Sequence, residues 1–272
     1  MSRDYYQLYG EAELAKGYWN PAFALWRAYE AEALSAIPFE QPILDLGCGD
    51  GTLARLVLAG ACAWGIDLGF EDLKKAVKLK NYALAIQSDA AHLPFPDAWF
   101  GSVMSNSAVE HMHQCSSVIH EVYRILRPGG VFAFTVPSHL YGDYLFTNCL
   151  LQWIGQKRLA DAFVRRKNKR VQHVNLHSPD EWRRILETCG FELVRADYIL
   201  AKSSCWLWEW PHTLFSWLQP IIHQMLRGSA CRRVLARPLL SVSSVTFGQA
   251  YWTWRDATCG ANLFLLAQRP AG

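Results

Sequence analysis

A short apolar run that stops in a glycine-rich loop is the feature that most constrains this chain. Residues Ile43–Leu46 are apolar except for Asp45, and glycines follow at positions 47, 49 and 51. A run of this kind, bounded by glycine, is typical of a buried strand. Because glycine has no Cβ, the backbone after the strand can turn sharply and a ligand can approach it closely. The sequence therefore predicts a strand, a binding loop and a helix over 52–59.

Strands and helices alternate along the rest of the chain. We expect further helices over 21–37, 70–80 and 115–126, a turn at 127–130, and further strands over 61–67, 84–89, 98–106 and 131–136. A capping box at Ser178 and Glu181, with Pro179 between them, begins a late helix, and strands follow over 191–200 and 261–268. Most strands are apolar on both faces, which is typical of a parallel sheet covered by helices. The prediction is an α/β, doubly wound, Rossmann-like fold whose seven-stranded sheet is mostly parallel, with insertions after strands five and six.

Three acidic residues, Asp45, Asp67 and Asp89, lie at the ends of three successive predicted strands. Ligands of open α/β sheets bind outside these ends of the strands. There Asp67 can accept hydrogen bonds from both hydroxyls of a ribose, and Asp89 can accept one from an adenine amino group. The glycines follow G-x-G-x-G rather than the dinucleotide pattern G-x-G-x-x-G, and Asp45 would repel a pyrophosphate. These residues favour a cationic, amino-bearing nucleoside over NAD.

These motifs resemble the class I S-adenosylmethionine-dependent methyltransferases, of the type 11 group that includes the ubiquinone and menaquinone methyltransferases. Residues 42–137 carry the resemblance strongly and residues 177–200 moderately, in the stretches LDLGCGDG, GID, SDAAHLPFPDAWFGSVMSNSAVEHM, EVYRILRPGGVFAFTVPS and HSPDEWRRILETCGFELV. It implies S-adenosyl-L-methionine as the cofactor and methyl donor. It also implies one domain, divided into a helical cover (1–40), a cofactor-binding core (41–137), acceptor-side insertions (138–177 and 201–258) and a final strand (259–272).

The resemblance assigns each motif residue a place along the cofactor. The loop residues that would line its methionine part are Asp45, Gly47, Cys48, Gly49 and Gly51. Asp67 would hold the ribose, Leu68 would pack on the adenine, and Asp89 with Ala90 would hold the adenine edge. Asn106 and Ser107 would lie beside the transferable methyl group. Tyr5, Tyr6 and Trp19 are candidates for the cover, or for ordinary helix packing.

Methyl transfer from a sulfonium mainly requires alignment and exclusion of water, and an oxygen or carbon acceptor also needs a base. The candidates for this base are His111 and Glu110, followed by His113, with His139 and His177 weaker. Alternatively, the Glu–His pair only orients its loop. No histidine or cysteine pair has ligand spacing, so we expect no metal.

The acceptor is suggested by an unusual concentration of tryptophan. Six of the 12 tryptophans lie in the last quarter of the chain, at positions 206, 208, 210, 217, 252 and 254. Residues 156–170 are strongly basic, and arginines follow at 227, 232, 233 and 237. This composition predicts a hydrophobic acceptor (lipid, quinone or isoprenoid-like) and peripheral membrane contact through 201–237. The uncharged run over 210–226 is too short and too interrupted by proline to span a bilayer.

Other interpretations remain open at this point. The acceptor can be a sugar or a secondary metabolite, with the tryptophans forming a structural cap or a dimer contact. Two alternatives of other classes are a non-catalytic S-adenosylmethionine-binding partner subunit and an NAD-dependent oxidoreductase, which the glycine spacing disfavours. The net charge of +3 gives no reason to expect nucleic acid. Eight scattered cysteines and a polar N-terminus predict a cytoplasmic protein, peripheral at the inner membrane face if it contacts a membrane.

Overall fold

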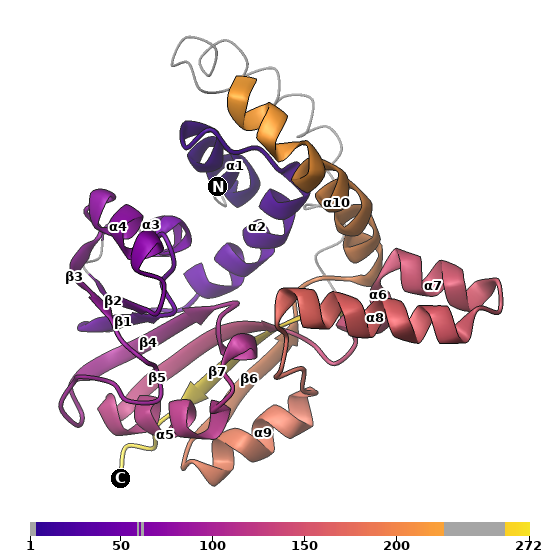
Figure 1. The fold of residues 1–272 in the computed structure, drawn as a ribbon. Coiled ribbons are helices and arrows are strands. Elements are labelled where there is room, and N and C mark those ends of the chain that lie inside the picture. The colour runs from indigo at the N-terminus through magenta and orange to yellow at the C-terminus, as the bar shows by residue number, and fades with distance from the viewer. Residues whose placement is uncertain (1–3, 59, 61–62, 226–258) are drawn as a thin grey trace.

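The computed structural model describes residues 4–58, 60, 63–225 and 259–272. Its centre is one seven-stranded sheet with helices on both faces (Figure 1). The strands are β1 (Ile43–Leu46), β2 (Ala63–Asp67), β3 (Tyr82–Gln87), β4 (Phe100–Asn106), β5 (Leu126–Pro137), β6 (Glu192–Tyr198) and β7 (Asn262–Gln268). They lie in the order β3-β2-β1-β4-β5-β7-β6, and only β7 runs antiparallel to its neighbours. The predicted seven-stranded, mostly parallel sheet is confirmed.

Helices cover the sheet in two layers. The first layer comprises α1 (Tyr5–Ala15), α2 (Pro21–Ser35) and α3 (Thr52–Val57), which share one apolar cluster with the start of α10 (Lys202–Met225). The second comprises α5 (Cys115–Ile125) and α9 (Pro179–Thr188), which share the other cluster. The helix α4 (Phe70–Lys78) packs beside β2 and β3. Along β1, Ile43 belongs to the first cluster, and Leu44 and Leu46 belong to the second. This alternation explains why the strand is buried on both faces.

Two local predictions at chain turns had different outcomes. The capping box at the start of α9 is present: Glu181 N donates to Ser178 Oγ at 3.3 Å, and Ser178 N donates to Glu181 Oε2 at 2.7 Å. Residues 127–130, which we predicted to be a turn, instead belong to β5. The pairing with β4 slips there, because Phe100 pairs with Leu126 but Ser102 pairs with Val131. The extra residues form a bulge at the start of the strand.

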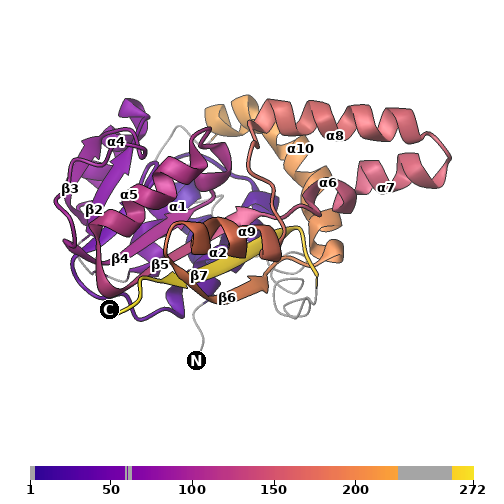
Figure 2. The same ribbon diagram turned by 90° about the horizontal axis from the view of Figure 1, so that it is seen from below.

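Both insertions are helical where they are described. After β5 come α6 (Tyr141–Tyr144), α7 (Phe146–Trp153) and α8 (Lys157–Val171), and α7 and α8 project from the sheet side by side (Figures 1 and 2). After β6, α10 packs against α2 and contains Pro211 and Pro220. Within the described ranges, no helix is long and apolar enough to cross a membrane. The predicted features at 226–258, including Trp252, Trp254 and the four arginines, lie outside the described residues.

A buried carboxylate joins the first helical layer to the sheet. Glu30, on α2, is fully buried. Its Oε1 accepts hydrogen bonds from Trp26 Nε1 at 2.9 Å, from Asn262 Nδ2 at 2.9 Å and from Ser107 Oγ. Its Oε2 accepts from Arg27 at 2.7 Å. One side chain therefore fixes α2 against the end of β4 and the start of β7.

We expect Glu30→Gln to destabilise the fold strongly. Removing one partner of a fully buried ion pair typically costs about 3–5 kcal/mol, and we expect a loss that approaches this range because Glu30 is fully buried while the Arg27 side chain is 20% exposed. Urea unfolding measures the change, with Glu11→Gln on the exposed face of α1 as the control. Equal stability of Glu30→Gln and wild type would show that α2 is held mainly by its apolar contacts.

Candidate active site

The loop after β1 requires glycine for a steric reason. Gly47 N and Cys48 N both donate to the carbonyl of Ile66 at 2.9 Å, which turns the chain directly at the strand end. Gly47 has φ +73°, and a Cβ there would lie 2.5 Å from the Cβ of Ala108. Any larger residue would therefore push the loop away from the segment that follows β4.

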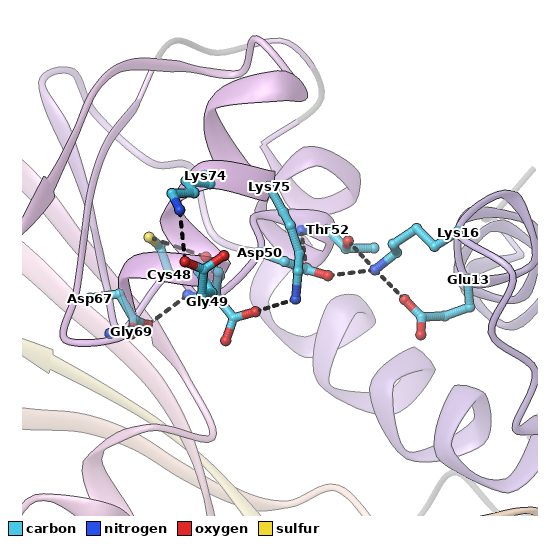
Figure 3. Close-up of polar contacts among 12 residues, drawn as sticks. Glu13, Lys16, Cys48, Gly49, Asp50, Thr52, Asp67, Gly69, Lys74 and Lys75 are labelled. Carbon is cyan, nitrogen blue, oxygen red and sulfur yellow. Dashed lines mark hydrogen bonds and ion pairs between the residues drawn. The ribbon is translucent and has the colours of Figure 1, made fainter. Parts of the chain in front are cut away.

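Asp67, the last residue of β2, organises the same loop. Its Oδ2 accepts a hydrogen bond from Gly49 N at 2.8 Å, and its Oδ1 accepts from Gly69 N at 2.7 Å (Figure 3). An ionised carboxylate has about four acceptor positions, so two remain for a ligand. The geometry is compatible with the predicted binding of two ribose hydroxyls.

Asp45 lies under the loop, and only 3% of it is exposed. Tyr82 donates its hydroxyl proton to Asp45 Oδ2 at 2.6 Å. Burial raises the pKa of Asp45 to about 7; the hydrogen bond from Tyr82 opposes this shift and the charge of Asp67 adds to it. The carboxyl group therefore changes its charge within the physiological pH range.

The N-terminal helix is tied to the glycine loop by one lysine. Lys16, which follows α1, donates to Asp50 Oδ2 at 2.6 Å and to Thr52 Oγ1 at 2.7 Å, and it forms an ion pair with Glu13 (Figure 3). Burial alone would raise the pKa of Asp50, but the Lys16 ammonium holds it below its usual value. The helical cover predicted over 1–40 is thus anchored to the binding loop.

These elements enclose a cavity of about 580 Å³, here called the first cavity. Its volume is typical of a ligand or cofactor site. Twelve of the predicted site residues line it: Asp45, Gly47, Cys48, Gly49, Asp67, Leu68, Asp89, Ala90, Asn106, Ser107, His111 and His113.

The other predicted residues lie elsewhere. Gly51 is outside the lining of the first cavity and caps α3, and Glu110 lines a second cavity described below. Tyr5, Tyr6 and Trp19 are buried. Tyr9 and Arg27, which sequence reasoning did not single out, line the first cavity in their place.

The rim of the first cavity combines an apolar side chain with polar groups. Leu68 is 68% exposed, and Asp89 Oδ1 accepts a hydrogen bond from Ala91 N at 2.9 Å. Ser107 has φ +44°, a conformation that is uncommon outside glycine and recurs at functional sites. This backbone is held by Ser107 N, which donates to the carbonyl of Thr135 at 3.0 Å.

A second cavity of about 350 Å³ adjoins the first. The two share Arg27, Ser107 and His111. Both insertions and α2 contribute the other walls, whose aromatic residues are Phe23, Trp26, Tyr141, Trp208 and Trp217. The same cavity contains Lys167 and Arg170; Lys167 Nζ lies 5.3 Å from the centre of the Trp208 ring, and burial lowers its pKa.

The predicted catalytic pair lies where the cavities meet, beside a histidine from the first insertion. Glu110 and His111 belong to the 3₁₀ helix η1 (Val109–His111), and His173 follows α8. Burial raises the pKa of Glu110 to about 8, and burial together with His111 and Lys167 lowers the pKa of His173 to about 4. His111 Nδ1 lies 3.1 Å from the carbonyl of Gln172, so this nitrogen carries the proton. In the neutral imidazole, the lone pair is then on His111 Nε2.

Comparison with known proteins identifies the core. Residues 44–134 match the family described as methyltransferase domain. A methyltransferase dependent on S-adenosylmethionine from Thermotoga maritima shares the fold over 91% of both chains, with a TM-score of 0.56 and 15% sequence identity. The chain contains a class I S-adenosylmethionine-dependent methyltransferase domain.

Curated relatives of this methyltransferase domain differ in their acceptors. The malonyl-[acyl-carrier protein] O-methyltransferase of Enterobacter lignolyticus is 36% identical over 94 residues, which are 34% of this chain and 38% of the relative. The match thus spans well under two thirds of that relative's length. A ubiquinone/menaquinone biosynthesis C-methyltransferase of Haemophilus ducreyi is 27% identical over 190 residues, or 62% of this chain and 71% of the relative.

The residues of the first cavity fit S-adenosylmethionine. Asp45, Asp67 and Asp89 supply acceptors for a ligand rich in hydroxyl and amino groups, and Leu68 offers an apolar surface for a flat ring. A Cβ on Gly49 would meet no atom within 4 Å, so the loop backbone itself borders the open space. When bound, S-adenosylmethionine supplies an electrophilic methyl group on a positively charged sulfur. The place of each residue along it stays a prediction.

We expect Asp67→Ala to weaken S-adenosylhomocysteine binding by roughly 10- to 100-fold, because hydrogen bonds to a charged group contribute about 1.5–3 kcal/mol. Calorimetric titration measures the affinity, and thermal unfolding tests whether the loop remains folded. Glu71→Ala, at an exposed ion pair on α4, is the matched control. Unchanged affinity in Asp67→Ala would contradict the assignment of the ribose site.

The raised pKa of Asp45 predicts a pH-dependent stability. From the ordinary pKa of 3.8 up to about 7, the unfolded chain loses the Asp45 proton while the folded chain keeps it, so this group lowers stability as pH rises. Asp45→Asn cannot ionise. As pH rises over this interval, the unfolding free energy of Asp45→Asn should therefore increase relative to that of wild type, by on the order of 4 kcal/mol at most. Chemical unfolding at several pH values measures the difference; a constant difference would contradict the shift.

Proposed function

We propose that this protein transfers the methyl group of S-adenosylmethionine to a bulky hydrophobic acceptor that binds in the second cavity. The observation that carries the proposal is the shared wall of Arg27, Ser107 and His111 between the two cavities. Methyl transfer requires the acceptor atom to lie in line with the methyl group and close to it. A chamber that adjoins the first cavity at this wall meets that requirement.

The lining of the second cavity favours an acceptor with a large apolar part. The centres of the Trp26 and Trp208 rings are 4.9 Å apart, and the centres of the Tyr141 and Trp208 rings are 6.2 Å apart. Such packed aromatic surfaces bind flat rings and hydrocarbon chains well. The similarity to a ubiquinone/menaquinone biosynthesis C-methyltransferase supports a lipid, quinone or isoprenoid-like compound.

The cationic side chains of the second cavity restrict this class further. Lys167 and Arg170 favour an acceptor whose apolar body carries a polar or anionic group. At the shared wall, His111 Nε2 has the lone pair needed to take a proton from an acceptor hydroxyl. These groups support an amphipathic acceptor whose reactive end faces the first cavity.

The outer face of α10 supports peripheral contact with a membrane surface. Its exposed apolar residues recur every three or four positions: Trp206, Trp210, Leu214, Trp217, Leu218, Ile221 and Met225. This spacing places them along one side of the helix, and tryptophan is favoured at membrane interfaces. A lipid-dissolved acceptor could then enter near Trp217, which also lines the second cavity.

The acceptor class is tested by incubating the protein with methyl-labelled S-adenosylmethionine and a detergent-solubilised lipid extract of its source cells. We expect label in the organic phase, at a rate that Trp217→Ala lowers several-fold because an acceptor contact is lost. Trp153→Ala is the matched control: both tryptophans are 83% exposed, and Trp153 lies outside the lining of both cavities.

Label confined to the aqueous phase, with a cell lysate as the acceptor source, would contradict the hydrophobic acceptor. It would favour a sugar or small metabolite. Equal rates in the two tryptophan variants would remove the second cavity from the proposed acceptor path.

A further inference from the structure

We propose that Glu110, His111 and His173 form a binding site for a divalent transition-metal ion at the wall between the two cavities. One ligand atom from each residue lies within 4.8 Å of the other two. Sequence spacing gave no reason to expect this site, because His173 comes from the far end of the first insertion. The fold brings it to the Glu–His pair, so this proposal departs from our prediction of no metal, which rested on sequence spacing alone.

Two potential ligand atoms of the cluster are buried without a partner. Among the described residues, no hydrogen-bond donor reaches Glu110 Oε2, and no partner reaches His173 Nδ1. Glu110 is only 1% exposed, so water does not compensate its carboxylate from outside. Buried polar groups are normally paired, so two unpaired atoms in one cluster of potential ligands fit a site for an ion.

The third ligand is already oriented for coordination. His111 Nδ1 donates its proton to the carbonyl of Gln172, which leaves the Nε2 lone pair 3.7 Å from Glu110 Oε1. Metal-binding histidines in proteins usually donate their other ring proton to a backbone carbonyl or a carboxylate in this way. A bound cation would lie between the two side chains and replace their direct interaction.

The backbone around the cluster is held in place from both sides. Val174 N and Asn175 N donate to the carbonyl of Glu110 at 2.8 and 3.1 Å. The Asn175 side-chain amide donates to the carbonyls of Val109 and Met112 at 2.9 and 2.7 Å. These bonds join η1 to the segment that carries His173, so the three ligands do not depend on a bound ion to meet.

The ligand set selects a class of ion. Two imidazoles and one carboxylate suit Zn²⁺, Mn²⁺ or Fe²⁺, whereas Mg²⁺ and Ca²⁺ prefer oxygen ligands. Three protein ligands also leave coordination positions open, as in catalytic zinc sites. Resting on the proposed function, we assign the open position to an oxygen of the acceptor, which the ion would hold at the shared wall and make more acidic. With the ion bound, His111 Nε2 is a ligand and no longer the base, so the acceptor proton would pass to water.

The site is tested by calorimetric titration of chelator-treated, desalted protein with Zn²⁺ and, separately, with Mn²⁺. We expect one ion per chain, with the affinity lowered at least tenfold in Glu110→Gln and in His173→Ala. His139→Ala is the matched control, since it removes an exposed histidine outside the cluster. The Mn²⁺ titration distinguishes binding at this site from binding to the free cysteine thiols of the chain, because Mn²⁺ binds thiols weakly.

The proposal is overturned if wild type binds neither ion, or if Glu110→Gln and His173→Ala bind both ions as wild type does. Circular dichroism of each variant verifies folding, and Glu110→Gln keeps the volume of the buried side chain. S-adenosylhomocysteine affinity is measured on the same samples. In wild type, absence of metal binding with clear S-adenosylhomocysteine binding refutes the metal site alone, and metal binding without S-adenosylhomocysteine binding refutes the proposed methyl transfer alone.

Discussion

The buried carboxylate of Glu30 is the interaction on which the arrangement of the two cavities depends. It accepts hydrogen bonds from α2 itself, from the loop after β4 and from β7. Arg27 and Ser107, both bound to it, lie on the wall between the cavities. A carboxylate with this many donors is stable inside the protein, because each lost contact with water is replaced. The position of the helical cover and the shape of the shared wall therefore have one common cause.

Much of the fold could be predicted because its signals are local. The run at Ile43–Leu46 is apolar on both faces, and the capping box at Ser178 satisfies the free N–H groups of a helix start; both patterns are complete within a few residues. The bulge at residues 127–130 could not be predicted in the same way. Arg-Pro-Gly-Gly has the composition of a turn, and only the pairing of its flanking residues with β4 shows that the strand continues.

The same distinction, between residues placed by local sequence signals and residues placed by tertiary packing, applies to the candidate site. Acids and glycines at the ends of parallel strands must meet at one edge of the sheet, so twelve of the predicted residues line one cavity. Arg27 on α2, Lys167 on α8 and His173 after α8 reach the second cavity from segments that have no fixed relation to the strands. Their positions result from tertiary packing, such as the hydrogen bonds of Asn175 to the loop after β4. No spacing rule within the sequence contains that information.

The place of β7 in the sheet has a consequence for how the chain folds. This strand is inserted between β5 and β6, and its Asn262 meets Glu30 across a separation of 232 residues. Until that late segment has been synthesised, β5 and β6 have no common neighbour and the carboxylate on α2 lacks one of its donors. Contacts of such long sequence separation slow folding and leave strand edges open in the meantime. A nascent chain of this protein therefore carries an incomplete sheet until residues Asn262–Gln268 have left the ribosome.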